Sequence, residues 1–217
     1  MSESRLICIV GPDGAGKSTQ AELLQEELES RGHDCKYQWL RFNHMLSLPL
    51  LGIARLLGLS EMEELESGRK VGYHYFWQSR VLSYIYPITL FLDTLIMYVS
   101  KILWPLESSD QVLICDRFIH DTLVGLMIST GRKSLHTSFT GRLFLKLIPS
   151  KTTTIVLNAD AEVLRNRRDD VRADKTIQEK IDRYNELANY LELPVLDAAN
   201  SPEDIQKKIQ KLAKPDY

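Results

Sequence analysis

The stretch GPDGAGKST, residues 11–19, constrains the fold of this chain more than any other feature. Residues 11–18 fit the pattern Gly-x-x-x-x-Gly-Lys-Ser/Thr at every fixed position. The apolar run RLICIV precedes the motif, and the amphipathic stretch QAELLQEELESRG follows it. A strand that leads through such a loop into a helix is the context in which the motif binds phosphate, whereas a chance glycine-rich turn would lack that context.

The chemistry of this loop predicts a bound nucleoside triphosphate. Glycines let successive backbone N–H groups point at one anion, and the helix that starts near Lys17 adds the positive end of its dipole. Lys17 would neutralise the β- and γ-phosphates, and the Ser18 hydroxyl would bind Mg²⁺. The predicted nucleotide-binding residues of the loop are Gly11, Pro12, Asp13, Gly14, Ala15, Gly16, Lys17, Ser18 and Thr19.

The rest of the pattern alternates strands and helices and predicts an α/β fold. Short, mostly apolar runs are typical of parallel strands buried on both faces, and the predicted strands are 6–10, 35–39, 112–115, 153–157 and 194–196. Helix signals stand between them, among them Arg31-Gly32 at a helix end and Ser201-Pro202 at a helix start. We predict one doubly wound domain over residues 1–217, with a five-stranded parallel sheet and helices on both faces.

Composition narrows the partners and the compartment. The chain has 217 residues and a net charge of −2, which gives no reason to expect nucleic acid as a partner. Its three cysteines, Cys8, Cys35 and Cys115, lie in separate apolar stretches without metal-ligand spacing, as expected in a reducing compartment. Five apolar residues before Gly11 are too few for a signal-peptide core. We therefore expect a cytoplasmic protein.

Residues 81–104, VLSYIYPITLFLDTLIMYVSKILW, are nearly long enough to cross a bilayer. Pro87, Asp93 and Lys101 interrupt the run, and a carboxylate in mid-membrane is costly. We predict a long, mostly buried helix packed on the sheet. Together with MLSLPLLGIARLLGL at 45–59, it leaves much apolar surface, which a homodimer interface or a membrane-surface contact would cover.

The third predicted strand runs into CDRFIHD, residues 115–121. An acid at the carboxyl end of a strand beside the phosphate loop is placed to face a metal, so Asp116 is a candidate Mg²⁺ ligand. Arg117 would then face the crevice, where its planar fork can hold phosphate. The alternative is that Asp116 caps the next helix and Arg117 is its ion-pair partner on the surface.

A cluster of arginines follows the fourth predicted strand in RNRRDDVRADK. Such a cluster is usually a solvated helical face. In a phosphoryl-transfer enzyme it could instead form a lid, at about residues 165–174, that excludes water and stabilises charge on the transferring group. The candidate catalytic arginines are Arg165, Arg167 and Arg168.

Five segments resemble the thymidylate kinase family of P-loop nucleoside monophosphate kinases, in order and in approximate spacing: GPDGAGKST, CDRF, FWQSR, TIVLNADAEVLRNRR and VLDAANSPEDI. The resemblance covers residues 4–40 and 110–213 and is thin between them. It implies a five-stranded parallel sheet, ATP as the phosphate donor, and a helical acceptor-side segment at about 41–110.

The resemblance also implies roles for single residues. Asp13 matches a loop carboxylate that approaches the acceptor sugar, and Gly14 stands where one branch of the family has a basic residue, so the catalytic arginine is expected from the lid. Phe76 and Arg80 match a helix whose aromatic ring stacks on the base. Ala198, in DAANS, belongs to the segment that lines adenine.

The chain departs from the family on the acceptor side. Only Arg41 in WLRFNHM is a candidate phosphate ligand after the second strand, and FIHDTLVGLM replaces the groups expected near thymine. The predicted acceptor-binding residues are thus Arg41, Phe76, Arg80 and Arg117.

We predict a Mg²⁺-dependent kinase that moves the γ-phosphoryl group of ATP to a nucleoside monophosphate, with dTMP as the predicted acceptor. Lys17, Asp13, Arg117 and the lid arginines would be its catalytic residues. One alternative is a P-loop kinase of another nucleotide or of a phosphorylated metabolite. Another is a non-catalytic nucleotide-binding protein peripheral to a membrane. The absence of an Asn-Lys-x-Asp motif argues against a GTPase switch.

Overall fold

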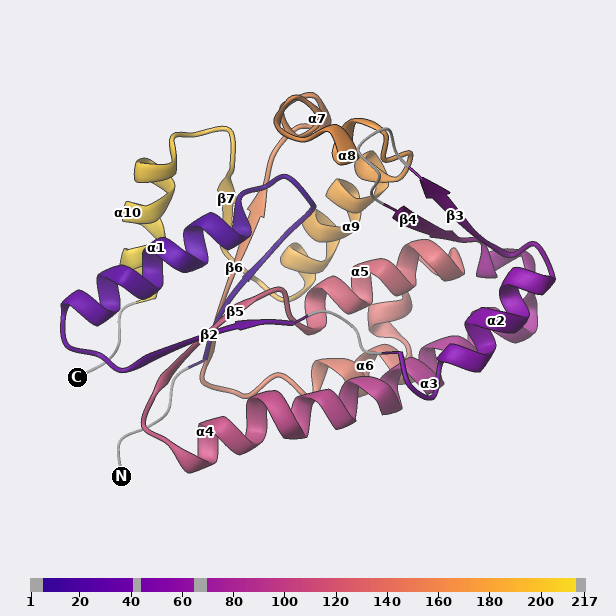
Figure 1. The fold of residues 1–217 in the computed structure, drawn as a ribbon, viewed down its shortest axis with the longest axis horizontal. Coiled ribbons are helices and arrows are strands. Elements are labelled where there is room, and N and C mark those ends of the chain that lie inside the picture. Colours follow the sequence, from indigo (N-terminus) through magenta and orange to yellow (C-terminus); the bar gives the residue numbers. More distant parts are fainter. Residues whose placement is uncertain (1–5, 41–43, 65–69, 214–217) are drawn as a thin grey trace.

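The structure, a computed structural model, describes residues 6–40, 44–64 and 70–213. The predicted phosphate ligand Arg41 lies outside these residues. Five parallel strands form the main sheet in the order β2-β5-β1-β6-β7 (Figure 1). Their bounds are β1 Leu6–Val10, β2 Cys35–Trp39, β5 Val112–Asp116, β6 Thr152–Asn158 and β7 Val195–Asp197. All five predicted strands are confirmed, with ends that shift by at most one residue.

The order of the strands creates a crevice beside β1. The chain places β2 and β5 on one side of β1 and β6 and β7 on the other, so that the strand order reverses at β1. Ile9 of β1 stands opposite Asp116 of β5 and Ile155 of β6. Ligands of doubly wound sheets bind outside the carboxyl ends of the strands at such a reversal.

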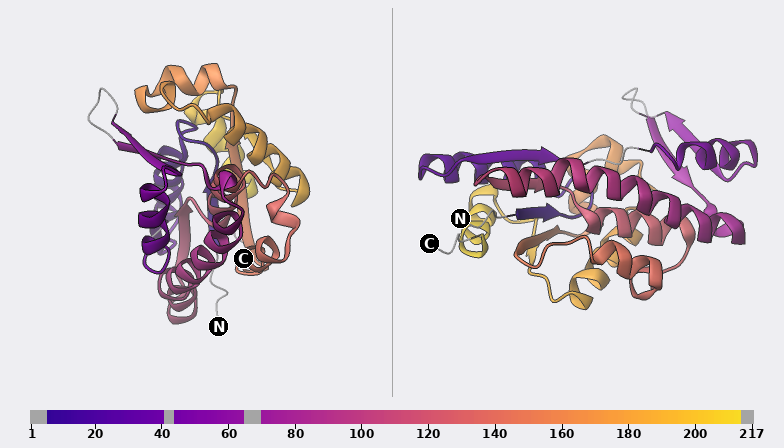
Figure 2. Two further views of the ribbon diagram at one scale, coloured as in Figure 1. Left: turned by 90° about the vertical axis from the view of Figure 1, so that its right-hand side faces the viewer. Right: turned by 90° about the horizontal axis from the view of Figure 1, so that it is seen from below.

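Helices cover both faces of the sheet (Figures 1 and 2). The helices are α1 Lys17–Ser30, α2 Leu48–Leu56, α3 Arg80–Tyr98, α4 Trp104–Ser108, α5 Ile119–Thr130, α6 Phe139–Leu145, α7 Ala161–Arg167, α8 Asp169–Arg172, α9 Ile177–Tyr190 and α10 Pro202–Leu212. A π-helical turn, Val99–Leu103, joins α3 to α4, and 3₁₀ turns stand at Phe76–Gln78 and Leu135–Thr137. Figure 2 shows α3 running across the sheet layer when the molecule is seen from below.

Successive residues of a strand point to opposite faces of the sheet and pack into two separate hydrophobic cores. In β1, Leu6, Cys8 and Val10 belong to a cluster shared with α3, α5 and α6, whereas Ile7 and Ile9 pack with α1 and α10. Because both faces of the sheet are covered at its centre, the inner strands β1 and β5 read as continuous or nearly continuous apolar runs. This burial explains why they could be predicted from the sequence.

The predicted helix ends are also confirmed. Gly16 adopts a left-handed conformation directly before α1, and Gly32 does so just after it, with φ values of 86° and 88°. Glycine is favoured at both positions because it has no Cβ and therefore adopts the left-handed conformation without a steric penalty. At the start of α10 the Ser201 hydroxyl accepts a hydrogen bond from the Asp204 backbone N–H at 3.2 Å.

The acceptor-side segment contains a hairpin that the sequence analysis missed. Strands β3 Ser60–Glu64 and β4 Lys70–His74 pair antiparallel as a separate two-stranded sheet. The helical segment predicted at about 41–110 therefore contains a two-stranded sheet beside its helices α2, α3 and α4. The sequence of β3, SEMEE, is rich in glutamate, which is depleted in strands, so its propensity hides the strand. In Figure 1 the hairpin lies between α2 and α8.

The apolar run at 81–104 forms a continuous helical rod, Arg80–Ser108. Within the described residues, this is the one helix whose length and composition would suffice to span a membrane, and 44% of its most apolar window is buried. The prediction that the helix is mostly buried is therefore wrong. Its main contacts are with α5 and α6 rather than with the sheet. Asp93, which interrupts the run, is buried. Its carboxylate accepts hydrogen bonds from the backbone N–H groups of Leu46 and Ser47 at 2.7 and 2.9 Å, which offset the cost of burying the charge.

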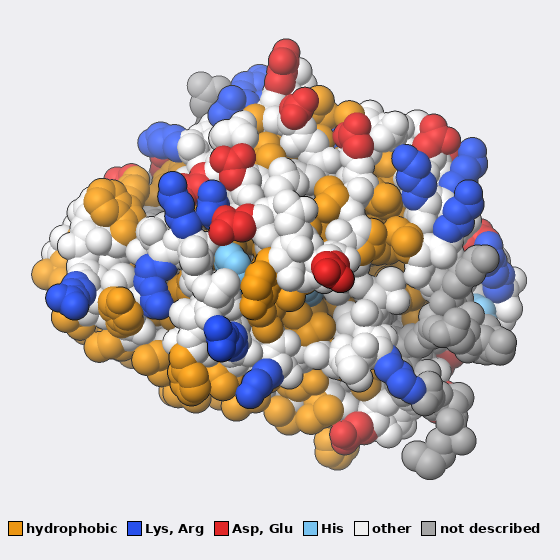
Figure 3. Space-filling model, turned by 180° about the vertical axis from the view of Figure 1, so that it is seen from behind, with side chains coloured by type: hydrophobic (Ala, Val, Ile, Leu, Met, Phe, Trp, Pro, Cys, Tyr) orange, Lys and Arg blue, Asp and Glu red, His pale blue; other side chains and the backbone are white. Residues whose placement is uncertain are grey.

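One face of this rod remains open to solvent. Its exposed residues follow helical spacings of three and four, and each is 42–63% exposed: Val81, Ile85, Ile88, Leu92, Ile96 and Val99. Figure 3 shows apolar side chains gathered along the lower edge of the molecule, where α3 and α4 run.

Candidate active site

The phosphate loop connects β1 to α1, and its glycines have conformations that other residues rarely adopt. Gly11 and Gly14 have φ values of 145° and 85°. A Cβ on Gly11 would lie 2.0 Å from the Leu157 carbonyl oxygen, so β6 packs directly against the loop. Gly16, with φ 86°, turns the chain into α1. The loop requires glycine at these positions because its backbone bends into left-handed conformations and, at Gly11, approaches a neighbouring strand.

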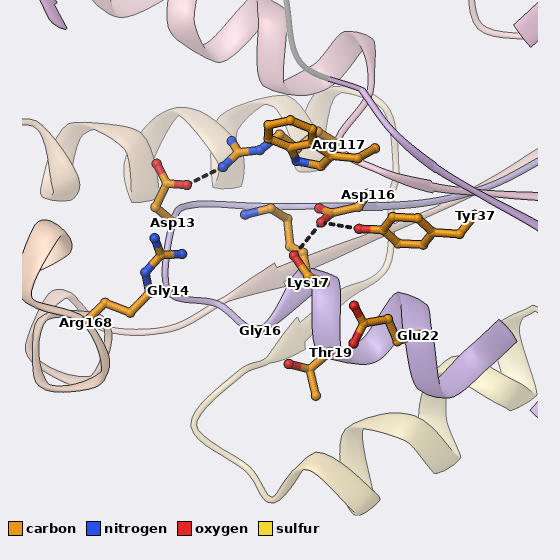
Figure 4. A pocket seen from close by; sticks show the side chains of 12 residues that line it. Asp13, Gly14, Gly16, Lys17, Thr19, Glu22, Tyr37, Asp116, Arg117 and Arg168 are labelled. Atoms are coloured by element: carbon orange, nitrogen blue, oxygen red, sulfur yellow. Dashed lines mark hydrogen bonds and ion pairs between the residues drawn. The ribbon is translucent and has the colours of Figure 1, made fainter. Parts of the chain in front are cut away.

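Lys17 is the first residue of α1, and its side chain returns to the loop. Its ammonium donates a hydrogen bond to the Pro12 carbonyl at 2.8 Å, and the side chain is buried. Burial, and then the nearby Arg117 guanidinium, lower the pKa of Lys17 to about 8. In Figure 4 Lys17 lies between the Asp13–Arg117 pair and Asp116. The amine therefore remains charged at neutral pH and lies next to further charged groups.

Asp116 ends β5 and joins three elements. Its Oδ2 accepts hydrogen bonds from the Ser18 hydroxyl of α1 at 2.5 Å and from the Tyr37 hydroxyl of β2 at 3.0 Å. Its Oδ1 is buried and has no hydrogen-bonding partner among the described residues. A buried carboxylate oxygen without a partner is costly, and a cation beside Ser18 would satisfy it.

These two residues fit a magnesium ion that also binds phosphate. Mg²⁺ is usually held by one or two side chains together with substrate phosphates and water. The described residues contain no group of three or more His, Cys, Asp or Glu that could hold a metal alone. Ser18 and Asp116 would therefore hold Mg²⁺ only together with a nucleotide.

Arg117 follows Asp116 in a left-handed conformation, with φ 72°. Such a φ is uncommon in a residue other than glycine, asparagine or aspartate, and its strain is typical of functional sites. The turn directs the guanidinium to Asp13 in the phosphate loop, where the two side chains form an ion pair. Burial disfavours the charge of Asp13, but Arg117, Lys17 and Lys180 hold the pKa of Asp13 well below its usual range.

The alternative considered for this turn is that Asp116 caps α5 and forms an ion pair with Arg117, and the structure contradicts it. Asp121, not Asp116, closes the start of α5, accepting a hydrogen bond from the Phe118 backbone N–H at 2.7 Å. Asp121 also accepts one from the Tyr184 hydroxyl of α9 at 2.7 Å. Arg117 pairs across the crevice with the loop residue Asp13 rather than with its sequence neighbour.

The three lid arginines have different surroundings. Arg168 lines the cleft beside the phosphate loop and pairs with Asp170 at 2.7 Å (Figure 4). Arg167 donates to the Ala198 carbonyl at 2.5 Å, and its second nitrogen lies 3.5 Å from the Gly14 carbonyl. Arg165 does not line the cleft. Arg167 thus connects the segment predicted to form a lid to the loop after β7, and Arg168 is the one of the three arginines that lines the cleft.

The cleft has a volume of about 480 Å³ and its charged groups meet at the phosphate loop. Its lining residues are Asp13, Gly14, Gly16, Lys17, Ser18, Thr19, Glu22, Tyr37, Trp39, Asp116, Arg117 and Arg168. Sequence analysis missed Glu22, Tyr37 and Trp39. Tyr37 and Trp39 alternate along β2 near its carboxyl end, a position that could have indicated contact with the crevice. Among the predicted loop residues, Gly11, Pro12 and Ala15 shape the backbone without lining the cleft.

A second pocket of about 310 Å³ lies between β4, α5 and the start of α9. Its lining residues are Val71, Gly72, Tyr73, His74, Tyr75, Trp77, Gly125, Ile128, Ser129, Asp174, Thr176, Glu179 and Lys180. Lys180 lies 3.7 Å from Asp13, which lines the first cleft. The two cavities therefore adjoin across this ion pair.

Two predicted acceptor residues lie elsewhere. Phe76 is buried, with ring centroids 5.1 Å from His74 and 4.5 Å from Tyr86, and it lines neither cavity. Arg80 is exposed at the start of α3. The two residues do not share a helix as expected, because Ser79 adopts an extended conformation and caps α3 with its hydroxyl.

The cationic side chains of the first cleft gather at the carboxyl edge of the sheet, beside the loop between β1 and α1. This arrangement places the chain among the P-loop nucleotide-binding proteins. Comparison with known proteins finds similar chains. A curated protein from Symbiobacterium thermophilum, named Thymidylate kinase, is 29% identical over an alignment of 220 residues, covering 96% of this chain and 92% of that protein.

A second curated protein, from Pyrococcus horikoshii and named Probable thymidylate kinase, is 32% identical over 117 residues, 54% of this chain and 49% of that protein. The crystal structure of thymidylate kinase from Ehrlichia chaffeensis has the same fold, with a TM-score of 0.57 at 17% identity over 97% of this chain and 99% of that one. No family model matches the chain. The chain is thus similar over almost its whole length to a curated protein named Thymidylate kinase, and it shares the fold of a solved thymidylate kinase.

Proposed function

We propose that the chain transfers the γ-phosphoryl group of ATP to a nucleoside monophosphate, and that this acceptor is dTMP. The observation that carries the proposal is the contact between two cavities at Asp13, which lies between Arg117 of the first cleft and Lys180 of the second pocket. Transfer between two nucleotides requires two sites whose phosphate ends meet. Here they would meet among cations, where the repulsion between the phosphates is reduced.

The first cleft suits the donor. Backbone N–H groups of the loop and Lys17 would hold the β- and γ-phosphates of ATP. Ser18 and Asp116 would hold Mg²⁺, which when bound neutralises charge on the phosphates. Ala198, whose backbone N–H donates to the Asn158 carbonyl at 2.7 Å, fixes the loop proposed to line adenine.

The second pocket suits the acceptor nucleoside. Aromatic residues of the hairpin region form one wall, and Gly125 of α5 forms part of the other. A flat base is the kind of group that fits between aromatic side chains and an open glycine face. The names of the two curated relatives favour dTMP over other nucleotides.

Transfer needs positioning and charge stabilisation rather than a base. An oxygen of the acceptor phosphate would form a bond to the γ-phosphorus of ATP. The bond between that phosphorus and the oxygen that bridges it to the β-phosphorus would break, and ADP would leave with this oxygen. The nucleophile is already an anion, so no proton has to be removed. Lys17, Arg117 and Arg168 would stabilise charge on the transferring group, and the lid would exclude water.

The experiment is to measure ADP formation from ATP and Mg²⁺ with dTMP, with other nucleoside monophosphates and with no acceptor. Strong stimulation by dTMP supports the proposal in full. Stimulation by a different monophosphate keeps the reaction and changes the acceptor. If ATP binds and no monophosphate stimulates ADP formation, the chain is a nucleotide-binding protein without this activity.

A further inference from the structure

Lys180 occupies the boundary between the two cavities. It lies in the first turn of α9, and its side chain is about three-quarters buried. Its ammonium lies 2.6 Å from Asp174 Oδ2 and 3.7 Å from Asp13 Oδ2. No motif in the sequence points to this residue, because its partners come from the lid end and from the phosphate loop, far apart in the chain.

Asp13 divides its two oxygens between two cations. Arg117 binds Oδ1 from the side of the first cleft, and Lys180 approaches Oδ2 from the side of the second pocket. One carboxylate thus holds two positive groups at the boundary. An anion there would meet both cations, and Lys180 could turn to it from its longer contact with Asp13 at little cost.

We propose that Lys180 binds the phosphate of the incoming nucleoside monophosphate, opposite Arg117, and thereby selects a nucleotide over its nucleoside. This inference rests on the proposed function. The nucleoside would fill the second pocket while its phosphate reaches the donor cleft, so the phosphate has to lie where the two cavities adjoin. Arg117 offers a planar fork to that phosphate, and Lys180 offers a point charge from the other side.

A purely structural role is the competing explanation, because Asp174 is buried and needs partners. It accepts hydrogen bonds from the Thr176 backbone N–H at 2.8 Å and the Thr176 hydroxyl at 2.7 Å, as well as from Lys180. Removing Lys180 could therefore loosen the start of α9. A loosened pocket would weaken binding of the nucleoside as well as the nucleotide, so the neutral nucleoside separates the two explanations.

The test measures binding of dTMP, thymidine and ATP to the full chain and to three variants. Lys180→Met removes the charge, Lys180→Arg retains it, and Lys175→Met is the matched control. Lys175 lies on the same segment, pairs with Glu63 at 2.8 Å and does not line the pocket. We expect Lys180→Met to weaken dTMP binding about tenfold or more, as for loss of a charged hydrogen bond, with thymidine and ATP binding within about twofold. Lys180→Arg should recover most of the loss, and Lys175→Met should bind all three ligands like the wild type.

Equal weakening of dTMP and thymidine by Lys180→Met, or no weakening of either, overturns the role of Lys180 while leaving the kinase proposal intact. If the wild type binds another monophosphate instead of dTMP, the same comparison is made with that nucleotide and its nucleoside. If the wild type binds ATP but no monophosphate, the proposed function fails, and this inference fails with it.

Discussion

The Ser18 hydroxyl donates a 2.5 Å hydrogen bond to Asp116 Oδ2, which joins the first turn of α1 to the last residue of β5. The other oxygen of the same carboxylate is buried without a partner among the described residues. The pair therefore combines an oriented hydroxyl with an acceptor left open, beside the loop that would hold phosphate. This is the arrangement expected for side chains that share a metal ion with a nucleotide.

This pair predicts the effect of Asp116→Asn. The amide keeps the size of the carboxylate but loses the charge that would face Mg²⁺, so we expect turnover to fall about 100-fold or more. Tyr37→Phe is the control, since it removes only the second hydrogen bond to Oδ2; we expect a loss within about tenfold. Initial rates over a Mg²⁺ titration provide the measurement, and wild-type turnover in Asp116→Asn would contradict the metal role.

Arg117→Ala should reduce turnover far more than ATP binding. The guanidinium faces the junction of the cavities rather than the phosphate loop alone, and loss of a group that stabilises charge in transfer costs about 100-fold or more in kcat. We expect the Kd for ATP to change within about threefold, because Lys17 and the loop remain. Steady-state kinetics and titration with ATP separate the two quantities, and unchanged turnover would contradict the assigned role.

Much of this fold was predictable because each signal is local. The inner strands β1 and β5 are buried at every residue, so they read as apolar runs. Gly16 and Gly32 mark the ends of α1, and Ser201 marks the start of α10. The phosphate loop was predictable for the same reason, because its glycines, lysine and serine are consecutive in the chain.

The acceptor side was not predictable, because its contacts join distant segments. Glu63 of β3 pairs with Lys175 beyond the lid, and Lys180 approaches Asp13 from the other end of the chain. No periodicity records such pairings. Phe76 was misplaced for a related reason: the spacing to Arg80 suits one helix, but Ser79 caps α3 and separates them.

The lid arginines should differ in importance. Arg168 lines the cleft, whereas Arg165 does not, so we expect Arg168→Ala to lower kcat about tenfold or more and Arg165→Ala to stay within about twofold. Arg167→Ala should weaken ATP binding, because its contacts with Ala198 and Gly14 fix the loop proposed to line adenine. Comparing kcat and the Kd for ATP across the three variants checks this order. A larger loss of kcat in Arg165→Ala than in Arg168→Ala would contradict it.

The lowered pKa of Lys17, about 8, predicts weaker ATP binding in alkaline solution. Below about pH 8 the amine of Lys17 is charged and attracts phosphate, and above about pH 8 the free protein loses this charge. The same pKa affects stability. Between about pH 8 and pH 10.5, the ordinary pKa of lysine, the unfolded chain still holds the proton that the folded chain has released, so Lys17 makes the free energy of unfolding rise with pH in this range. Titrations from pH 6.5 to 9.5 should show the Kd for ATP rising above pH 8, whereas the Kd for adenosine, which lacks phosphate, stays flat. Parallel rises for both ligands would assign the effect to another group.

Gly125 predicts opposite effects on stability and function. It lies in α5, lines the second pocket, and a Cβ added there would meet no atom within 4 Å. Packing therefore gives no reason for glycine, although glycine in a helix interior costs about 0.5–1 kcal/mol relative to alanine. We expect Gly125→Ala to raise the free energy of unfolding by about that amount.

Gly125→Leu should also fold, but its side chain would enter the pocket and raise the KM for the acceptor about tenfold or more, with the Kd for ATP unchanged. Denaturant unfolding and acceptor kinetics on both variants decide the matter: if Gly125→Leu binds the acceptor like the wild type, the acceptor base does not lie against α5.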